Sequence, residues 1–258
     1  MAVTSDGVPT LRLDHIRKQF GGVVAVQDCS LAVWPGEIVA LVGDNGAGKS
    51  TVVKLVSGVH RPTSGSMYLS GQPVQFGDAS SARKHGVEVV YQDLALAEMQ
   101  PVYMNMFLGR ERVKGPLWRL DKQGMAAETQ ALLNDLDVRI PSARATIRDL
   151  SGGQRQAVAI ARATHWATSL ILMDEPTAAL GVAETARVEE LLLQLRDRCR
   201  AILLVSHNLD QVFRVADRIV VLRRGVQVGV RRTRQTTQNE IVSMVTGLQA
   251  ADDPITER

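Results

Sequence analysis

The sequence predicts an α/β fold on a mostly parallel sheet, with an antiparallel β part at the N-terminus and an inserted helical subdomain. Apolar strand-like runs alternate with helix-like runs over most of the 258 residues, which is typical of parallel sheets. One glycine-rich segment stands between such a strand and such a helix, the usual place of a phosphate-binding loop. A helix-rich block over about 93–153 interrupts the alternation. With 45% hydrophobic residues, the chain can bury one large core or two small ones.

The N-terminal third is predicted to hold several strands and the first helix. LRLDHIRKQF and VVAVQDCSLAVW alternate, whereas EIVALVG, after a turn at Pro35-Gly36, is almost continuously apolar. Alternation indicates half-buried strands, and a short apolar run indicates a fully buried one. Helical spacing of apolar residues begins at Lys49 and ends near Ser57, and residues 59–74 are turn-rich and strand-like.

In the remaining two thirds of the chain, the segment 93–136 is predicted to be mostly helical, with a break at Lys114-Gly115-Pro116. The later predicted elements are a long helix from SGGQ to Trp166, a strand at LILMD, a helix at VAETARVEELLLQLRDRC, a strand at AILLVS, a short helix at LDQVFRVAD and a hairpin at RIVVLRRGVQVGV. The loose start over 1–10 and the polar tail ADDPITER predict little regular structure at either end.

Charge and composition argue against several classes of protein. The formal net charge is only +3, and a nucleic-acid binder usually carries a concentrated basic stripe. The densest basic cluster consists of Arg223, Arg224, Arg231, Arg232 and Arg234. We expect it to be a solvated or phosphate-adjacent edge, so no nucleic-acid partner is predicted.

The cysteines and the apolar runs bear on the compartment. Cys29 and Cys199 are far apart and form no C-x-x-C motif, which fits two buried or half-buried thiols in a reducing cytosol. No apolar run approaches the length of a membrane span. The first residues also lack the form of a signal peptide. We therefore expect a soluble, cytoplasmic chain, unless a partner holds it on a membrane.

A phosphate-binding loop is predicted at GDNGAGKST, which follows the strand EIVALV and fits G-x-x-x-x-G-K-[ST]. The residues expected to contact the nucleotide here are Gly43, Asp44, Asn45, Gly46, Ala47, Gly48, Lys49, Ser50 and Thr51. Glycines allow successive N–H groups to point at a phosphate, and the positive end of the helix faces the same anion. Lys49 is expected to reach the β- and γ-phosphates, and the Ser50 hydroxyl to bind Mg²⁺.

Two carboxylates follow the strand LILMD. Asp174 is predicted to hold Mg²⁺ through its water shell, since a strand beside the phosphate loop commonly ends in such an acid. Glu175 is not needed for the metal, and it is placed to orient or polarise an attacking water as the catalytic base.

A second anion-binding segment is predicted at LSGGQ, residues 150–154. Ser151 with two glycines at a helix start supplies free N–H groups. A plain helix cap is the alternative reading. Because one nucleotide does not need two such nests, two chains are expected to complete each other's sites.

Together these segments resemble the ATP-binding cassette (ABC) ATPases, which have a P-loop NTPase fold, over about residues 9–247. The resemblance implies ATP and Mg²⁺ as ligands. It also implies that Phe20 stacks on adenine, that Gln92 senses the γ-phosphate and joins Ser50 and Asp174 at the metal, and that His207 is a catalytic residue contacting the γ-phosphate.

The resemblance also implies a domain plan and a dimer. A single ABC domain would span 9–247, with a RecA-like core over about 9–92 and 154–230, a helical insert over about 93–153, and a polar tail over 248–258. The signature residues Ser151, Gly152, Gly153 and Gln154 would contact the ATP of a partner chain. Two copies would therefore form a homodimer on nucleotide binding.

Within the family, ARKHGVEVVYQDLAL, NMFLGRE, SHNLDQVFRVADRIVVLRRG and the terminal MVTG are similar to the simple-sugar importers of the ribose, xylose and fructose type. This likeness implies an ATPase subunit at the cytoplasmic face of the inner membrane, held there by integral-membrane permease subunits. An extracytoplasmic sugar-binding protein would be an indirect partner. Many members of this branch carry two cassettes in one chain, whereas this chain carries one.

One position departs from the family pattern. The turn after Glu175 commonly ends in Asp, but here it ends at Gly181. In one interpretation glycine only eases a tight turn. In the other, the missing acid weakens communication between the two sites of a dimer.

Other functions remain open at this stage. A soluble ABC ATPase acting on ribosomes or DNA usually has two cassettes or a long coiled-coil insertion. A GTPase would show N-K-x-D, and neither it nor a small-molecule kinase would explain LSGGQ. A non-catalytic binding module would not need both Asp174 and Glu175. A transporter of another substrate, or an exporter, is the nearest alternative.

Overall fold

The computed structural model describes residues 7–198 and 200–248. Cys199, most of the predicted N-terminal loose start and the tail ADDPITER lie outside the described residues, so those predictions are not addressed. The chain divides into two compact units, which we describe separately. Unit 1 comprises Met1–Val89, Ala167–Glu175 and Leu195–Arg258, and unit 2 comprises Val90–Trp166 and Pro176–Gln194.

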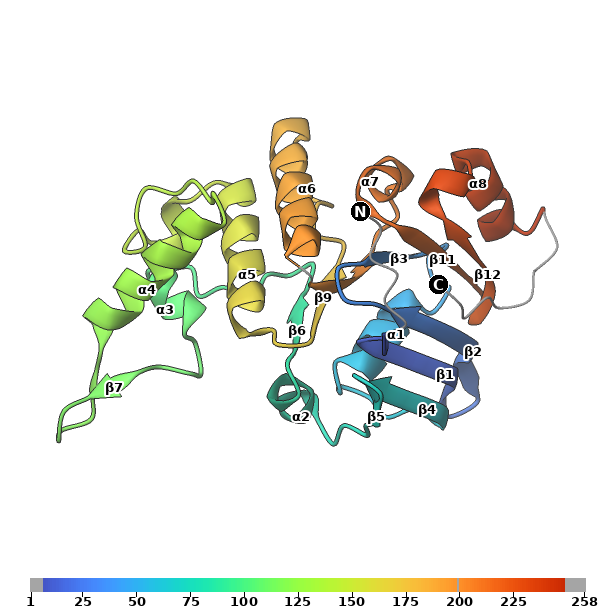
Figure 1. The fold of residues 1–258 in the computed structure, drawn as a ribbon, viewed down its shortest axis with the longest axis horizontal. Helices are drawn as coiled ribbons and strands as arrows, with labels where there is room; N and C mark the ends of the chain where they lie inside the picture. Colours follow the sequence, from blue (N-terminus) through green and yellow to red (C-terminus); the bar gives the residue numbers. More distant parts are fainter. Residues whose placement is uncertain (1–6, 199, 249–258) are drawn as a thin grey trace. The chain divides into compact units, whose positions relative to one another are not determined.

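One mixed sheet organises unit 1 (Figure 1). Its strands, in spatial order, are β5 (Gln72–Pro73), β4 (Ser64–Leu69), β1 (Leu11–Phe20), β2 (Val23–Val33), β12 (Val226–Arg232), β11 (Arg218–Arg223), β3 (Ile38–Val42), β10 (Ala201–Val205), β9 (Leu170–Asp174) and β6 (Val87–Val90). Strands β11, β3, β10 and β9 run parallel to one another. Strands β1, β2, β4 and β5 pair antiparallel. The predicted α/β fold with an N-terminal antiparallel part is confirmed.

The core of unit 1 lies on the parallel strands. Every residue of β3 and β10 is buried, as expected for strands in the middle of a parallel sheet. Helix α1 (Lys49–Val56) adds Val52, Val53, Leu55 and Val56 to this core. The other helices of unit 1 are α2 (Ala79–Lys84), α7 (Leu209–Val215), η2 (Thr233–Gln235) and α8 (Gln238–Thr246).

Unit 2 is mainly helical. It contains α3 (Val102–Met106), the hairpin β7 (Val113–Lys114) and β8 (Arg119–Leu120), α4 (Lys122–Asp135), η1 (Ile147–Asp149), α5 (Gly152–Trp166) and most of α6 (Val182–Asp197). Helix α5 packs against α3 and α4 (Figure 1). Unit 2 therefore includes all of α5, and together with Pro176–Gln194 it extends further along the chain than the helical insert predicted for 93–153.

The prediction that 93–136 is mostly helical is wrong, because within that range only α3 and α4 are helical, and neither 93–101 nor the segment between the two helices is. The break expected at Lys114-Gly115-Pro116 is the turn of a hairpin, in which Val113 pairs with Leu120. Proline cannot continue a helix, Gly115 takes a positive φ of 73°, and Lys114 forms a 2.8 Å ion pair with Asp121. These local preferences outweigh the helical pattern of the flanking residues.

Three elements have signals too weak for the sequence patterns used above. Helix α2 is short and polar, and the Asp78 side chain caps it by accepting from the Ser81 N–H. Helix α8 lies between a Thr237 cap and Gly247, whose φ is 85°. Strand β6 has four residues at the sheet edge. Within the described ranges, no helix is both long and apolar enough to cross a membrane.

Candidate functional site

The phosphate loop joins the buried strand β3 to α1. A Cβ atom at Gly43 would lie 2.0 Å from the carbonyl oxygen of Leu222, so only glycine fits this close approach of two backbones. Helix α1 begins with no side-chain cap and no acidic residue in its first turn. Its N-terminal N–H groups are therefore available to an anion.

The loop presents its central residues to solvent. Asp44, Asn45, Gly46 and Ser50 are exposed, Gly43, Gly48 and Thr51 are half-buried, and Ala47 and Lys49 are buried. The Lys49 Nζ donates to the carbonyl oxygens of Gly43 at 2.7 Å and Asp44 at 2.9 Å. Burial lowers the pKa of Lys49, and the nearby carboxylates of Glu175 and Asp174 oppose that shift. The ammonium is thus held inside the loop, close to both acids.

Asp174 ends β9 at the same sheet edge as the phosphate loop. Strand β10 lies between β3 and β9, and all three are parallel, so their carboxyl ends meet at one edge, where ligands bind in open α/β sheets. Burial and then the neighbouring charge of Glu175 raise the pKa of Asp174, whereas Lys49 acts in the opposite direction.

Glu175 and His207 are brought into contact. The Nδ1 of His207 lies 2.8 Å from an Oε of Glu175. Glu175 has a φ of 52°, which is uncommon for a non-glycine residue and costs backbone energy. Its N–H donates to the carbonyl oxygen of Val205 at 2.8 Å, so β10 holds the strained residue in place. The sequence proposed the two residues separately and did not predict their direct contact.

The donor set at this edge fits a hard cation. The Asp174 carboxylate and the exposed Ser50 hydroxyl are oxygen donors within unit 1. Mg²⁺ binds through one or two carboxylates and keeps waters and substrate phosphates as its other ligands. Over the described part of the chain, no group of three or more His, Cys, Asp or Glu could hold a metal alone. Gln92 is exposed and belongs to unit 2.

Phe20 lies at the end of β1 with 42% of its surface exposed. Its ring and that of His60 meet edge to face, with ring centroids 5.0 Å apart, and the Lys18 Nζ lies 4.8 Å from the Phe20 centroid. Sequence reasoning missed both Lys18 and His60, since neither belongs to a recognisable motif.

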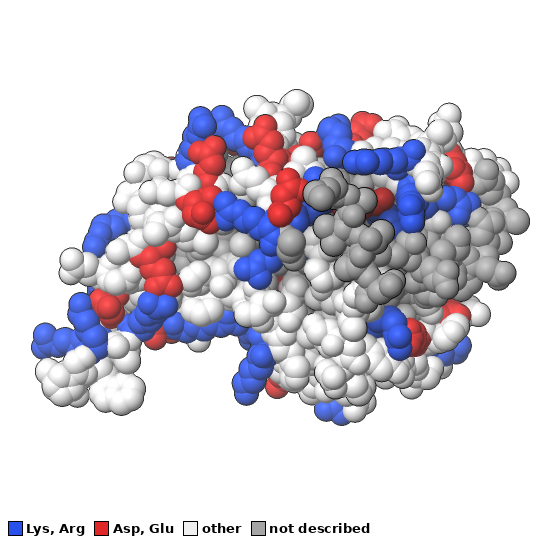
Figure 2. Space-filling model, viewed as in Figure 1, with Lys and Arg blue, Asp and Glu red and all other residues white. Residues whose placement is uncertain are grey.

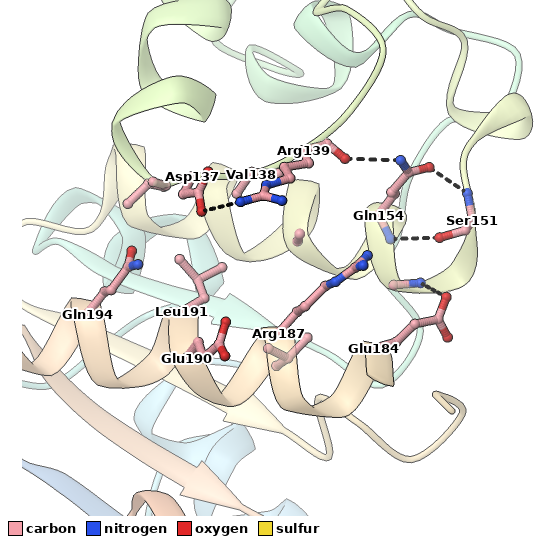
Figure 3. Close-up of a pocket in the computed structure, with 14 residues that line it drawn as sticks. Asp137, Val138, Arg139, Ser151, Gln154, Glu184, Arg187, Glu190, Leu191 and Gln194 are labelled. Carbon is pink, nitrogen blue, oxygen red and sulfur yellow. Dashed lines mark hydrogen bonds and ion pairs between the residues drawn. The ribbon is translucent and has the colours of Figure 1, made fainter. Parts of the chain in front are cut away.

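The signature loop, residues 150–154, is part of unit 2 and forms a capping box (Figure 3). The Gln154 N–H donates to the Ser151 Oγ at 3.2 Å, and the Ser151 N–H donates to the Gln154 Oε1 at 3.0 Å. The Gln154 side chain also donates to the Arg139 carbonyl oxygen at 3.0 Å. The S-x-x-Q spacing explains this reciprocal arrangement at the start of α5.

A cavity of about 180 Å³ lies beside this loop, between it and α6 (Figure 3). Glu184 on α6 accepts hydrogen bonds from the Gly153 N–H and the Gly181 N–H, each at 3.3 Å. Sequence reasoning missed Glu184. The spacing of Gly181 and Glu184, with an acid three residues after a helix cap, is the signal that could have identified it.

The interpretation that Gly181 eases a tight turn is wrong. Its φ is not positive, and an added Cβ would meet only the Glu184 carboxylate, at 3.9 Å. The backbone at this position therefore accepts other residues.

The predicted basic edge is partly engaged within unit 1. Arg231 forms a 2.6 Å ion pair with Glu240, and the Arg223 guanidinium donates to the Met244 carbonyl oxygen at 3.4 Å. Arg223 and Arg224 also line a cavity of about 560 Å³ with phosphate-loop residues 44–47. On the face shown in Figure 2, basic and acidic side chains are interspersed. The visible surface thus carries no continuous basic stripe.

Known proteins are similar to this chain in sequence and in fold. The ABC transporter family matches residues 26–178. A xylose/arabinose import ATP-binding protein of Sulfolobus acidocaldarius is 44% identical, with 92% of this chain and 93% of the relative covered. A fructose import ATP-binding protein of Rhizobium meliloti is 42% identical, with 93% and 94% covered. The solved structure of a nucleotide-free ATP-binding cassette from an ABC transporter has a TM-score of 0.79 at 24% identity, with 93% and 95% covered. The chain therefore belongs to the ABC transporter family, as one of its ATP-binding cassettes.

Proposed function

We propose that this chain hydrolyses ATP to power the import of a simple sugar through a membrane permease. The observation that carries the catalytic part is the 2.8 Å contact between Glu175 and His207, beside Asp174 and the phosphate loop. The names of the two relatives, which are sugar import ATP-binding proteins, support the sugar and the direction of transport.

Nucleotide binding begins at the phosphate loop. The N–H groups at the start of α1 receive the phosphates, and Lys49 exchanges its bonds to the Gly43 and Asp44 carbonyls for phosphate oxygens. Phe20 supplies the aromatic surface for adenine. Ser50 and Asp174, both in unit 1, would hold Mg²⁺, which neutralises phosphate charge when bound, and the role of Gln92 at the metal stays a prediction.

Hydrolysis depends on the acid after Asp174. The Glu175 carboxylate accepts the proton of an attacking water, which is the role of a general base. His207 contacts that carboxylate through Nδ1 and faces the γ-phosphate with Nε2, and the imidazolium form, which carries a proton on both ring nitrogens, donates to both groups. The strained backbone of Glu175, fixed by Val205, keeps the carboxylate in one direction.

The working form is a homodimer. Ser151, Gly152, Gly153 and Gln154 of each chain contact the ATP bound by the other, so ATP closes the dimer and hydrolysis reopens it. Integral-membrane permease subunits convert this motion into transport and hold the chain at the cytoplasmic face of the inner membrane. A sugar-loaded extracytoplasmic binding protein acts on the permease.

Glu175→Gln tests the catalytic assignment. The amide keeps the shape but cannot take a proton, so turnover should fall on the order of 100-fold, while ATP binding and the ATP-closed dimer persist. Size-exclusion chromatography with ATP should show a stable dimer for the variant and a monomer or mixture for the unmodified chain. Glu190→Gln, an exposed acid on α6, is the matched control. Turnover of Glu175→Gln at the unmodified rate would remove Glu175 as the base.

A second experiment tests the transported substrate. The chain is co-purified with candidate permeases in lipid vesicles, and ATPase activity is measured with binding proteins loaded with xylose, arabinose, fructose or ribose. One sugar-loaded binding protein should stimulate the activity. Stimulation only by a non-sugar substrate, or only by ribosomes or DNA, would overturn the import proposal.

A further inference from the structure

Glu184 joins two segments that are far apart in sequence. It is the third residue of α6, and one of its oxygens accepts from the Gly181 N–H at 3.3 Å, which closes the start of its own helix. The acidic half of a capping box explains this first bond, since Gly181 has no side chain to return it. It does not explain the second oxygen, which accepts from the Gly153 N–H of α5 at 3.3 Å (Figure 3).

The second bond places an anion inside the signature loop. The Ser151 hydroxyl already accepts a hydrogen bond from the Gln154 N–H, and the Gln154 side-chain oxygen accepts one from the Ser151 N–H. The Gly153 N–H, which precedes that of Gln154, donates to the Glu184 carboxylate. The side chain also packs closely on the loop, because a Cβ at Gly153 would lie 2.8 Å from its Cγ.

Glu184 remains charged in this position. Hydrogen bonds from Gly153 and then Gly181 lower its pKa, with smaller contributions from Ser151 and Arg187. The group is therefore a carboxylate at neutral pH. It lies where the proposed dimer needs the signature loop to receive the γ-phosphate of the partner's ATP.

We propose that Glu184 is a resident anion of the signature loop, and that the γ-phosphate of the partner-bound ATP displaces it from the Gly153 N–H when the dimer closes. This inference rests on the proposed function. One N–H cannot donate a full hydrogen bond to two anions at once. A carboxylate that stays beside the triphosphate also repels the triphosphate. Glu184 therefore raises the ATP concentration at which the dimer forms.

The alternative is that Glu184 only positions the loop, and it predicts the opposite effect. If the carboxylate holds the loop in its binding shape, neutralising it should weaken the dimer. Glu184→Gln separates the two cases, because the single amide oxygen can still accept from one of the two N–H groups while the charge is lost.

The experiment measures the dimer fraction against ATP concentration by size-exclusion chromatography, in the Glu175→Gln background where hydrolysis does not reopen the dimer. Adding Glu184→Gln should lower the ATP concentration at half-maximal dimer by about two- to fivefold, the range expected for partly exposed charges. The difference should shrink in high salt, because screening weakens the repulsion. Glu190 lines the same cavity, and Glu190→Gln should leave the ATP concentration at half-maximal dimer unchanged. Thermal unfolding without nucleotide checks that each variant is folded.

A midpoint that rises, or a lost dimer in a folded variant, would overturn the inference in favour of a positioning role. An unchanged midpoint, or a shift of equal size in Glu190→Gln, would overturn it as well. Failure of Glu175→Gln alone to dimerise with ATP would instead overturn the proposed function, together with the inference built on it.

Discussion

Gly43→Ala tests whether close backbone contact shapes the phosphate loop. The added Cβ would lie 2.0 Å from the Leu222 carbonyl oxygen. Gly43 also has a φ of 152°, which residues with a side chain rarely adopt. Ordinary contacts begin at 3.4 Å, so the loop or β11 must move by about 1.4 Å (3.4 minus 2.0). Both flanking strands lie in a packed core that resists such movement. We expect a loss of at least about 4 kcal/mol in the free energy of unfolding.

Gly46→Ala is the matched control in the same loop. Gly46 has a φ of 78°, but nothing lies within 4 Å of an added Cβ. Only the left-handed backbone is penalised, at about 1–2 kcal/mol. The melting temperature without nucleotide should therefore fall by about 2–8 °C for Gly46→Ala and by about 8–16 °C or more for Gly43→Ala. Equal shifts, or a larger shift for Gly46→Ala, would refute the steric reasoning.

Three further predictions concern charged residues. Lys49→Ala should weaken the binding of a fluorescent ATP analogue about tenfold or more and abolish turnover, and equal affinity would remove Lys49 from the site. The raised pKa of Asp174 means that its contribution to stability is full below the unfolded value of 3.8 and is lost as pH rises through the folded value. Asp174→Asn should therefore raise the melting temperature at about pH 7 but not at about pH 3, while turnover is lost. Arg218→Leu leaves the buried Glu37 carboxylate without its 2.5 Å ion pair, at a cost of about 3–5 kcal/mol by chemical denaturation. Adding Glu37→Gln should recover part of that loss, and full additivity of the two changes would contradict the pairing.

The sequence alone determined the features that local patterns encode. Continuous apolar runs indicated the parallel strands, because a strand buried on both faces has no polar face to alternate with. The loop from Gly43 to Ser50 and the acids at the end of β9 could be proposed as a nucleotide site because phosphate and Mg²⁺ chemistry requires specific residue types at fixed spacing. The S-x-x-Q spacing at Ser151 likewise encodes a helix start.

Only the tertiary structure decided which of these residues meet. His207 contacts Glu175 because parallel pairing of β9 with β10 brings two loop residues to one sheet edge, and that pairing is set by packing over the whole core. Glu184 reaches Gly153 for a similar reason, since no spacing rule links residues 31 positions apart. The hairpin at β7 and β8 was missed because a short turn can outweigh a helical pattern. Hydrophobic periodicity records how each segment buries its own surface, whereas a site depends on contacts between segments that form only when the whole domain is packed.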